Sequence, residues 1–429
     1  MSRRHFGTDG VRGLANVRLT ADLALALGRA TGRYLRETSD ARVVVIGRDT
    51  RRSGPMLQGA FAAGLQSAGV DVDLAGVCPT PTVSHAVRTS ERLVLGAVIS
   101  ASHNPAPDNG IKLFGADGRK LPDAAESRIE ALMEEPFTPG EVGRGTGDEI
   151  PGYSERYLEW LVGVGGGRIE GMRVAIDAAH GAAAVLGPDL FRRLGAQVYA
   201  TGVSPDGDNI NAEGGATKPS RIAELVKETG ADVGIAFDGD ADRAVFCDRG
   251  GRLINGDRVI GAWAKHEGAD RVVGTVMSNG GYEAWLTAQG IALERADVGD
   301  KYVAARMTEV GARIGGEQSG HLIFPAHSPT GDGLLTAVEF LRVLGESGRS
   351  AADVADDFEN WPQSLVNVGV ASKDGWQSRV AEEIAAAERI VAGRGRDNVR
   401  ASGTQPMLRV MVEADDVALR DEAAETVVR

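Results

Sequence analysis

A short acidic run contains the residues best suited to hold a metal ion. Asp238, Asp240 and Asp242 stand at alternate positions in Asp-Gly-Asp-Ala-Asp-Arg243, directly after an apolar run. Three carboxylates spaced in this way in an extended loop can face one hard cation, and Mg²⁺ prefers a few carboxylates together with phosphate oxygens. A calcium loop of the EF-hand type is excluded, because Arg243 and Arg249 stand where it needs glycine and a bidentate glutamate. The pattern favours a magnesium site over a solvated acidic turn, since clustered carboxylates after an apolar strand need a compensating cation.

A second polar loop, Ser100-Ala-Ser-His-Asn-Pro105, contains hydroxyls and an imidazole. The pair Ser102 and His103 suggests nucleophilic catalysis, but neighbours in sequence rarely form the hydrogen bond between nucleophile and base. Ser102 could instead hold a transferable group that turn amides and a metal bind. Lys112, one of only seven lysines in the chain, favours anion binding here. Taken alone, the loop is equally compatible with a polar turn.

Two further loops offer groups that bind sugars and phosphates. In Gly315-Gly-Glu-Gln-Ser-Gly-His321, Glu317 and Ser319 are a suitable pair for vicinal hydroxyls, and His321 could exchange protons near neutral pH. The last loop combines guanidinium, hydroxyl and backbone donors in the manner of an oxyanion site. Its residues are Arg400, Ser402, Gly403, Thr404 and Arg409.

The strands that must position these loops belong to three similar units. In each unit an apolar β-branched run leads into a helix and then, after a glycine, into a second strand; the first runs are 42–46, 172–176 and 271–276. This alternation is typical of βαβ units on a parallel sheet. A third strand in each unit, at 94–100, 232–237 or 312–315, ends at one of the first three loops. Ligands of α/β sheets lie at the carboxyl ends of strands, so we expect these loops to meet in one cleft.

The chain therefore reads as an α/β protein of three similar domains with mixed, mainly parallel sheets, followed by a small C-terminal α+β domain, all arranged around a central cleft. In this last domain we expect a strand at 365–370, a helix at 377–391, two strands around the loop 400–409 and a closing helix at 416–427. Boundaries at glycine- or proline-rich stretches predict four domains: 1–150 with the serine loop, 151–252 with the metal site, 253–363 for sugar binding and 364–429 for phosphate binding.

Composition excludes several classes of protein. The 429 residues have a net charge of −13, which argues against nucleic acid or an anionic membrane as partner. Two cysteines, Cys78 and Cys247, cannot form a disulfide framework, and no apolar run is long enough to span a membrane. We expect a cytoplasmic protein.

The four loops, in this order, resemble the α-D-phosphohexomutase family along essentially the whole chain. The segments Phe6-Gly-Thr-Asp-Gly-Val-Arg-Gly13, Gly47-Arg-Asp-Thr-Arg51 and Gly316-Glu-Gln-Ser-Gly-His321 are most similar to its bacterial phosphoglucosamine mutase branch. The resemblance implies that Ser102 is a phosphoserine and binds Mg²⁺ together with the three aspartates. It also implies that Arg12, Lys112 and Arg243 surround the reacting phosphate, that Glu317 and Ser319 bind sugar hydroxyls, and that the C-terminal loop binds the distal phosphate. We add His103 and His321 as candidate catalytic residues and Lys301 as a substrate-binding residue.

The activity implied by the resemblance is the interconversion of glucosamine 6-phosphate and glucosamine 1-phosphate on the route to UDP-N-acetylglucosamine. It implies one Mg²⁺ per chain, glucosamine or glucose 1,6-bisphosphate as activator, small sugar phosphates as partners, and a homodimer. Alternatives are a phosphomannomutase or phosphoglucomutase of the same fold, a sugar-phosphate phosphatase, and a non-catalytic sugar-phosphate sensor.

The chain departs from the family pattern at three positions. Ala401 and Gln405 replace the proline and glutamate of Arg-Pro-Ser-Gly-Thr-Glu-Pro, and Lys301 replaces an arginine. Lysine keeps the charge but lacks the bidentate fork, so we expect these changes to affect substrate affinity rather than catalysis itself.

Overall fold

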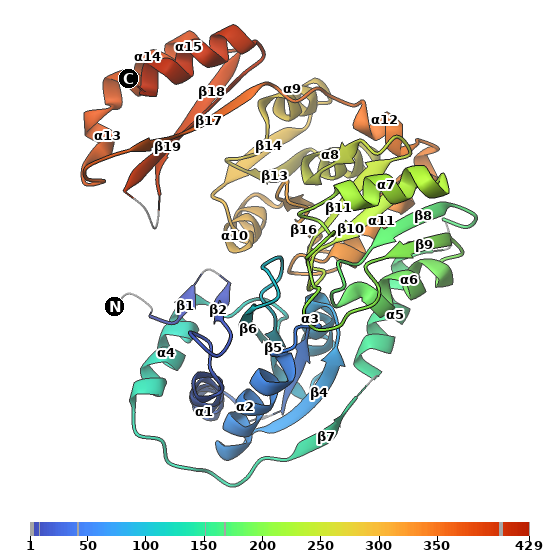
Figure 1. Ribbon diagram of the computed structural model, residues 1–429, viewed down its shortest axis with the longest axis vertical. Helices are drawn as coiled ribbons and strands as arrows, with labels where there is room; N and C mark the ends of the chain where they lie inside the picture. Colours follow the sequence, from blue (N-terminus) through green and yellow to red (C-terminus); the bar gives the residue numbers. More distant parts are fainter. Residues whose placement is uncertain are drawn as a thin grey trace.

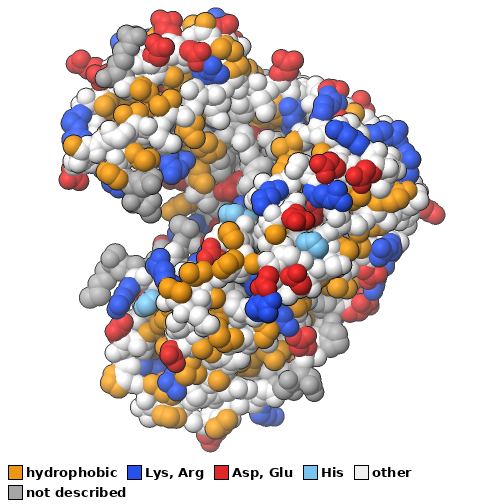
Figure 2. All heavy atoms as spheres, in the orientation of Figure 1, with side chains coloured by type: hydrophobic (Ala, Val, Ile, Leu, Met, Phe, Trp, Pro, Cys, Tyr) orange, Lys and Arg blue, Asp and Glu red, His pale blue; other side chains and the backbone are white. Residues whose placement is uncertain are grey.

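The computed structural model shows four parts that follow one another in an open ring (Figure 1). It describes residues 4–7, 9–40, 43–150, 152–166, 169–402 and 406–428, and within 146–148 only the backbone. The space-filling view shows the surface hollowed between the C-terminal lobe and the N-terminal lobe (Figure 2). In the described part of the chain, no helix has both the length and the apolar character needed to cross a bilayer.

The N-terminal part is built on a seven-stranded sheet in the order β1-β2-β6-β5-β3-β4-β7. Its central strand β3 has helices on both faces: Val44 and Ile46 pack with α1 and α2, whereas Val45 packs with α3. This two-sided burial explains the unbroken apolar run, because an inner parallel strand has no solvent face. The elements are β1 (Phe6–Gly7), β2 (Gly10–Leu14), α1 (Ala21–Thr38), β3 (Val43–Arg48), α2 (Gly54–Ser67), β4 (Asp71–Val77), α3 (Thr80–Arg88), β5 (Leu93–Ile99), β6 (Asp108–Gly115), α4 (Asp123–Glu134) and β7 (Gly145–Glu149).

The second and third sheets have the orders β12-β11-β10-β8-β9 and β14-β13-β15-β16, each with parallel inner strands and an antiparallel edge. One continuous hydrophobic core joins them, as Phe246 of β11 packs against Phe340 of α11. The elements of the second part are α5 (Gly152–Gly165), β8 (Arg173–Asp177), α6 (Ala183–Arg193), β9 (Gln197–Thr201), α7 (Ser220–Thr229), β10 (Val233–Phe237), β11 (Ala244–Asp248) and β12 (Leu253–Ile254). Those of the third are α8 (Gly256–Glu267), β13 (Arg271–Thr275), α9 (Gly280–Ala288), β14 (Ala292–Ala296), α10 (Asp300–Val310), β15 (Gly315–Gly316), β16 (Leu322–Ile323), α11 (Gly333–Ser347) and α12 (Ala351–Ala355).

The C-terminal part has its own small core between a three-stranded sheet, β17-β19-β18, and the helices α14 and α15. Arg396 links this part to the third sheet by donating to the carbonyls of Val276 and Ser278, each at 2.8 Å. The elements are β17 (Gln363–Gly369), α13 (Trp376–Arg379), α14 (Ala381–Ile390), β18 (Gly395–Ala401), β19 (Met407–Ala414) and α15 (Val417–Val428).

The α/β fold class is confirmed, with two local corrections. The helix predicted over 377–391 is two helices, because Val380 has a φ of −116°, outside the helical range, and caps both α13 and α14. The strand predicted over 312–315 is reduced to Gly315–Gly316, since two glycines offer little side chain to pack in a sheet.

Candidate active site

Ser102 lies where the serine loop leaves the carboxyl end of β5. Its backbone is in the left-handed region, with φ of 53°, and its amide donates to Ser100 Oγ at 2.9 Å. The Ser102 hydroxyl donates to Asp238 Oδ2 at 2.5 Å, across an interval of 136 residues. Gly239 permits this approach, because a Cβ there would lie 2.6 Å from the Ser102 carbonyl oxygen. The structure thus brings the serine loop and the acidic loop together.

The acidic triad follows β10, and its three side chains are buried. One oxygen from each of Asp238, Asp240 and Asp242 lies within 4.8 Å of the others. Asp240 Oδ1 and Asp242 Oδ1 are buried with no hydrogen-bond partner among the described residues. Burial and the two neighbouring carboxylates raise the pKa of Asp238 well above its usual value. Crowded carboxylate oxygens without a hydrogen bond fit a divalent cation, which would supply the missing ligand contacts and neutralise the repulsion.

Lys112 places a buried ammonium against the triad. The lysine sits on β6, which pairs antiparallel with β5, and its Nζ lies 2.7 Å from Asp240 Oδ2 and 3.4 Å from Asp242 Oδ2. Burial alone would lower its pKa, but Asp240, Asp9 and Asp242 raise it. Lys112 therefore stays charged and can attract an anion to this point.

Lys112 also belongs to a ring of alternating charges that joins the first three parts of the molecule. Asp9 contacts both Lys112, at 3.4 Å, and Lys120, which in turn lies 2.6 Å from Asp300. His321 Nε2 lies 3.7 Å from Asp300, and its Nδ1 lies 3.6 Å from Asp242. In order, the ring is Lys112, Asp9, Lys120, Asp300, His321 and Asp242. Burial lowers the pKa of His321, but its two carboxylate neighbours prevail and raise it.

Three further predicted residues border the serine. His103 is half-buried with Nδ1 3.4 Å from Ser102 Oγ, and burial together with Arg243 and Arg12 lowers its pKa, so the imidazole is neutral at pH 7. The Arg243 amide donates to Asp238 Oδ1 at 3.3 Å, and Arg12 is paired with Asp9. Nε of both arginines is buried without a hydrogen-bond partner in the described structure. Arg243 Nε lies 3.7 Å from Asp242 Oδ1, beyond hydrogen-bond distance, so each arginine has a donor without a hydrogen bond on the side of the acidic triad and the serine loop.

The loop over residues 315–321, which we call the sugar loop, is held by a backbone hydrogen bond from Glu317 to His321 and by Gly299, the residue that caps α10. Glu317 Oε1 accepts the Gly299 amide at 2.9 Å, and Ser319 Oγ donates to Glu317 Oε2 at 3.1 Å, so carboxylate and hydroxyl act as one pair. Lys301 lies apart from them: its Nζ is 3.2 Å from Asp123 of α4, bridging the first and third parts.

The C-terminal loop places two arginines directly opposite each other. Arg400 of β18 pairs in register with Arg409 of β19, which also faces Asn367 of β17. Lys373 Nζ donates to the Ser402 carbonyl at 2.7 Å. Like charges opposite each other on neighbouring strands are unfavourable unless an anion lies between them. Gly403, Thr404 and the departure at Gln405 lie outside the described residues.

Sequence reasoning missed several residues that the structure places at the site. Asp9, Lys120 and Asp300 complete the charge ring, and Asp49 and Arg51 lie under the serine loop. A signal was present for some of them, because Gly47-Arg-Asp-Thr-Arg51 and the segment with Asp9 contribute to the family resemblance. Nothing in the local pattern around Lys120 indicated its role.

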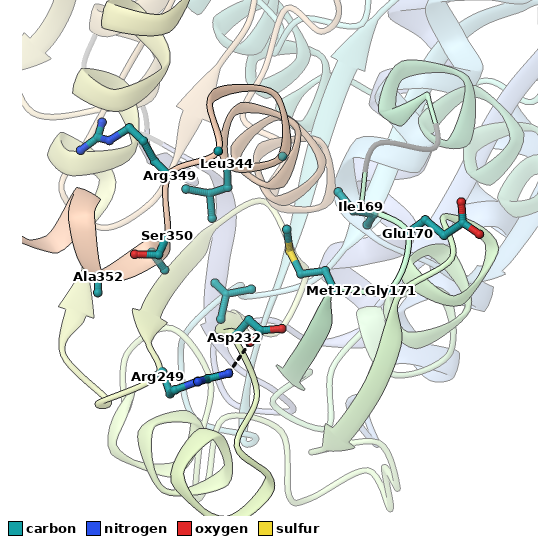
Figure 3. A pocket seen from close by; sticks show the side chains of 14 residues that line it. Ile169, Glu170, Gly171, Met172, Asp232, Arg249, Leu344, Arg349, Ser350 and Ala352 are labelled. Atoms are coloured by element: carbon teal, nitrogen blue, oxygen red, sulfur yellow. Dashed lines mark hydrogen bonds and ion pairs between the residues drawn. The ribbon is translucent and has the colours of Figure 1, made fainter.

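A cavity of about 720 Å³ lies at the opposite ends of the strands from this site (Figure 3). It borders Met172, just before β8, and Asp232, just before β10, whereas the triad follows the carboxyl end of β10. Arg249 in its wall is already paired with Asp232 at 2.6 Å. Neither its position nor its chemistry connects it with the serine.

Comparisons with known proteins agree with this geometry. Four models of the phosphoglucomutase/phosphomannomutase family match in order: alpha/beta/alpha domains I, II and III at 3–138, 152–251 and 255–361, and the C-terminal domain at 365–429. A phosphoglucosamine mutase of Symbiobacterium thermophilum is 49% identical, over 97% of this chain and 96% of its own. One from Thermus thermophilus is 47% identical, over 97% and 95%.

Solved structures agree on the fold. The crystal structure of a phosphoglucomutase/phosphomannomutase family protein from Burkholderia thailandensis has a TM-score of 0.82 and 25% identity, covering 98% of this chain and 95% of its own. Aspergillus fumigatus N-acetylphosphoglucosamine mutase, solved with GlcNAc-6P and magnesium, has a TM-score of 0.67 and 17% identity, covering 100% and 95%.

Proposed function

Because this chain belongs to the phosphoglucomutase/phosphomannomutase family, we propose that it interconverts glucosamine 6-phosphate and glucosamine 1-phosphate, with Ser102 as the residue that holds the transferred phosphoryl group. The observation that supports this most directly is the Ser102 hydroxyl, 2.5 Å from an oxygen of the acidic triad. The choice of amino sugar rests on the full-length relatives named phosphoglucosamine mutase.

The reaction balances as two phosphoryl transfers. In the first, the free 1- or 6-hydroxyl of the sugar phosphate attacks phospho-Ser102; the new O–P bond forms, the P–Oγ bond breaks, and a 1,6-bisphosphate and free serine result. In the second, the bisphosphate has turned end for end, and Ser102 Oγ attacks its other phosphate; the new P–Oγ bond forms and the bond from that phosphorus to the sugar oxygen breaks. Phospho-Ser102 is regenerated, the sugar oxygen takes up a proton, and the isomeric sugar monophosphate leaves. His103 Nδ1 lies 3.4 Å from Ser102 Oγ and would take the proton of the serine hydroxyl in that step, once this hydroxyl no longer donates to Asp238.

Phosphoserine and sugar phosphate repel each other, because phosphoserine has a charge of about −1.5 to −2. Lys112 and Arg243 offset this repulsion and stabilise the charge on the transferring group. Asp238, Asp240 and Asp242 would hold Mg²⁺ together with the phosphate on Ser102, and the ion would add further charge neutralisation there.

The sugar must bind in two opposite orientations. Glu317 and Ser319, joined at 3.1 Å, can hold vicinal ring hydroxyls in both. Arg400 and Arg409 can hold whichever phosphate is not reacting, since the pair recognises a phosphate and not its position on the sugar. The surface is hollowed between the C-terminal lobe and the N-terminal lobe (Figure 2), and the intermediate would turn in this hollow.

A substrate panel tests this proposal. Glucosamine, glucose and mannose 1-phosphates are each supplied with Mg²⁺ and glucose 1,6-bisphosphate as activator, and both isomerisation and release of inorganic phosphate are measured. We expect isomerisation with the highest kcat/KM for the glucosamine sugar. Preference for glucose or mannose would indicate a phosphoglucomutase or phosphomannomutase. Phosphate release without isomerisation would indicate a phosphatase, and binding without either reaction would indicate a sensor.

A further inference from the structure

Arg51 is a fully buried arginine directly beneath the serine loop, and all five N–H groups of its guanidinium are used. Nε donates to Asp49 Oδ2 at 2.9 Å. Nη2 donates to the carbonyls of Ser102 and Asn104, both at 2.8 Å. Nη1 donates to the carbonyl of Asp108 at 2.8 Å and to that of Pro105. One side chain therefore binds four carbonyls of the segment 102–108.

Asp49 extends the same network to the amide side of Ser102. Its Oδ2 accepts from Ser100 Oγ at 2.6 Å, and Ser100 Oγ accepts from the Ser102 amide at 2.9 Å. Asn211, from the second part of the chain, donates through Nδ2 to the carbonyl of Ser102 at 2.9 Å and to that of Asn104 at 3.1 Å. Both the N–H and the C=O of Ser102 are thus fixed by buried side chains.

These contacts hold Ser102 in a backbone conformation that it would not adopt alone. A φ of 53° is unfavourable for a residue with a Cβ, so the surroundings must maintain it. That conformation directs Oγ at Asp238. We infer that Arg51 is a positioning residue for phosphoryl transfer: Arg51 fixes the serine loop so that Ser102 Oγ meets the phosphate in line. This inference rests on the proposed mutase function.

Lysine cannot replace Arg51 in this role although it keeps the charge. Its ammonium has three donors on one nitrogen and cannot reach five acceptors spread around a planar fork. Arg51→Lys should therefore still allow an ion pair with the buried Asp49. It should remove most of the hydrogen bonds to the carbonyls of residues 102–108, so that the serine loop is less firmly held. The neighbouring Arg52 is a matched control, because its exposed guanidinium pairs with Asp208, at 2.9 and 3.0 Å from Nε.

The test compares Arg51→Lys with Arg52→Lys in full-length, Mg²⁺-loaded protein. A loop displaced by about 1 Å costs on the order of 100-fold in rate, so we expect kcat of Arg51→Lys to fall by about 100-fold with KM for glucosamine 6-phosphate changed less than about threefold. Phosphorylation of dephosphorylated Ser102 by glucose 1,6-bisphosphate, followed by intact mass, should slow equally, and amide exchange at 102–108 should accelerate. Arg52→Lys should differ from wild type by less than about twofold in each measurement.

Circular dichroism at the assay temperature confirms that the variants are folded. Should Arg51→Lys fail to fold, Ser100→Ala removes the acceptor of the Ser102 amide and the hydroxyl that donates to Asp49, while the contacts of Arg51 remain, and we expect about a tenfold loss in kcat at unchanged KM. A folded Arg51→Lys or Ser100→Ala protein with wild-type kcat would overturn the positioning role. Absence of isomerisation by the wild-type chain would instead refute the proposed function, so the two failures are distinguishable.

Discussion

The two opposed arginines of the C-terminal sheet allow a prediction in which stability and binding change in different ways. Arg400 faces Arg409 across β18 and β19, whereas Arg396, on the same face of β18, faces Glu413. Arg396 Nε lies 2.5 Å from Glu413 Oε1, and the Glu413 side chain is fully buried. Arg400→Met and Arg396→Met are therefore the same substitution at two positions of one strand, where the cross-strand partner has the same charge or the opposite charge. Arg396→Met also removes the hydrogen bonds to the carbonyls of Val276 and Ser278, which adds to its expected loss of stability.

The two substitutions should have different free-energy effects. Like charges directly opposite on a sheet cost about 0.2–1 kcal/mol, so Arg400→Met should leave the unliganded domain unchanged or stabilise it by up to that amount. Loss of the Arg400 guanidinium should also remove a charge-assisted contact to the distal phosphate. Such a contact is worth about 1.5–3 kcal/mol, or roughly 10- to 150-fold in Kd. Arg396→Met leaves the buried Glu413 without its cation and should destabilise the domain by about 3 kcal/mol.

Thermal melting without ligand measures the first effect, and titration calorimetry measures the second. Both variants are made in a Ser102→Ala background so that glucosamine 6-phosphate, glucosamine 1-phosphate and the bisphosphate bind without turnover. Arg400→Met should weaken all three ligands together, because in the proposed mechanism both orientations of the sugar use the same arginines. If Arg400→Met lowered Tm as much as Arg396→Met and left Kd unchanged, or weakened only one isomer, the shared phosphate site would have to be abandoned.

Three further predictions concern the remaining groups. Purified protein should be partly phosphorylated at Ser102, by peptide mapping, and Ser102→Ala should abolish turnover with little change in Tm; phosphate found only at Ser100 would contradict this. Chelation should remove activity reversibly, and Asp240→Asn should raise the Mg²⁺ concentration needed for half-maximal rate; full turnover in metal-free buffer would exclude the metal role. Burial raises the pKa of Asp332 to about 6 from an ordinary value near 3.8, so its ionisation destabilises the fold by about 3 kcal/mol as pH rises from about 4 to 6. The Tm of Asp332→Asn minus that of wild type should therefore increase as pH rises over that range. A difference in Tm that does not change with pH would refute the raised pKa of Asp332.

The sequence alone sufficed for the α/β class and for the strands that lead to the loops. The runs at 42–46, 172–176 and 271–276 are β3, β8 and β13 within two residues, because inner parallel strands are buried on both faces and cannot alternate with polar residues. Prediction from the sequence was wrong where the residues themselves contain little local signal for the break or the strand. The helix over 377–391 breaks at Val380, which no glycine or proline marks, and the Gly315–Gly316 strand contains no side chain to show its periodicity.

At the candidate site, sequence determined which chemical groups are available: a serine loop, three alternate carboxylates, a carboxylate–hydroxyl pair and two arginines around a turn. Only the tertiary structure decided which of them meet and what supports them. Ser102 and Asp238 are 136 residues apart, and Arg51 reaches the Ser102 carbonyl across an interval of 51 residues. The ring through Lys120 and Asp300 also joins separate sheets. Such contacts depend on how the sheets pack against one another, and a local pattern of residues reports the end of a strand but not the neighbour across the interface.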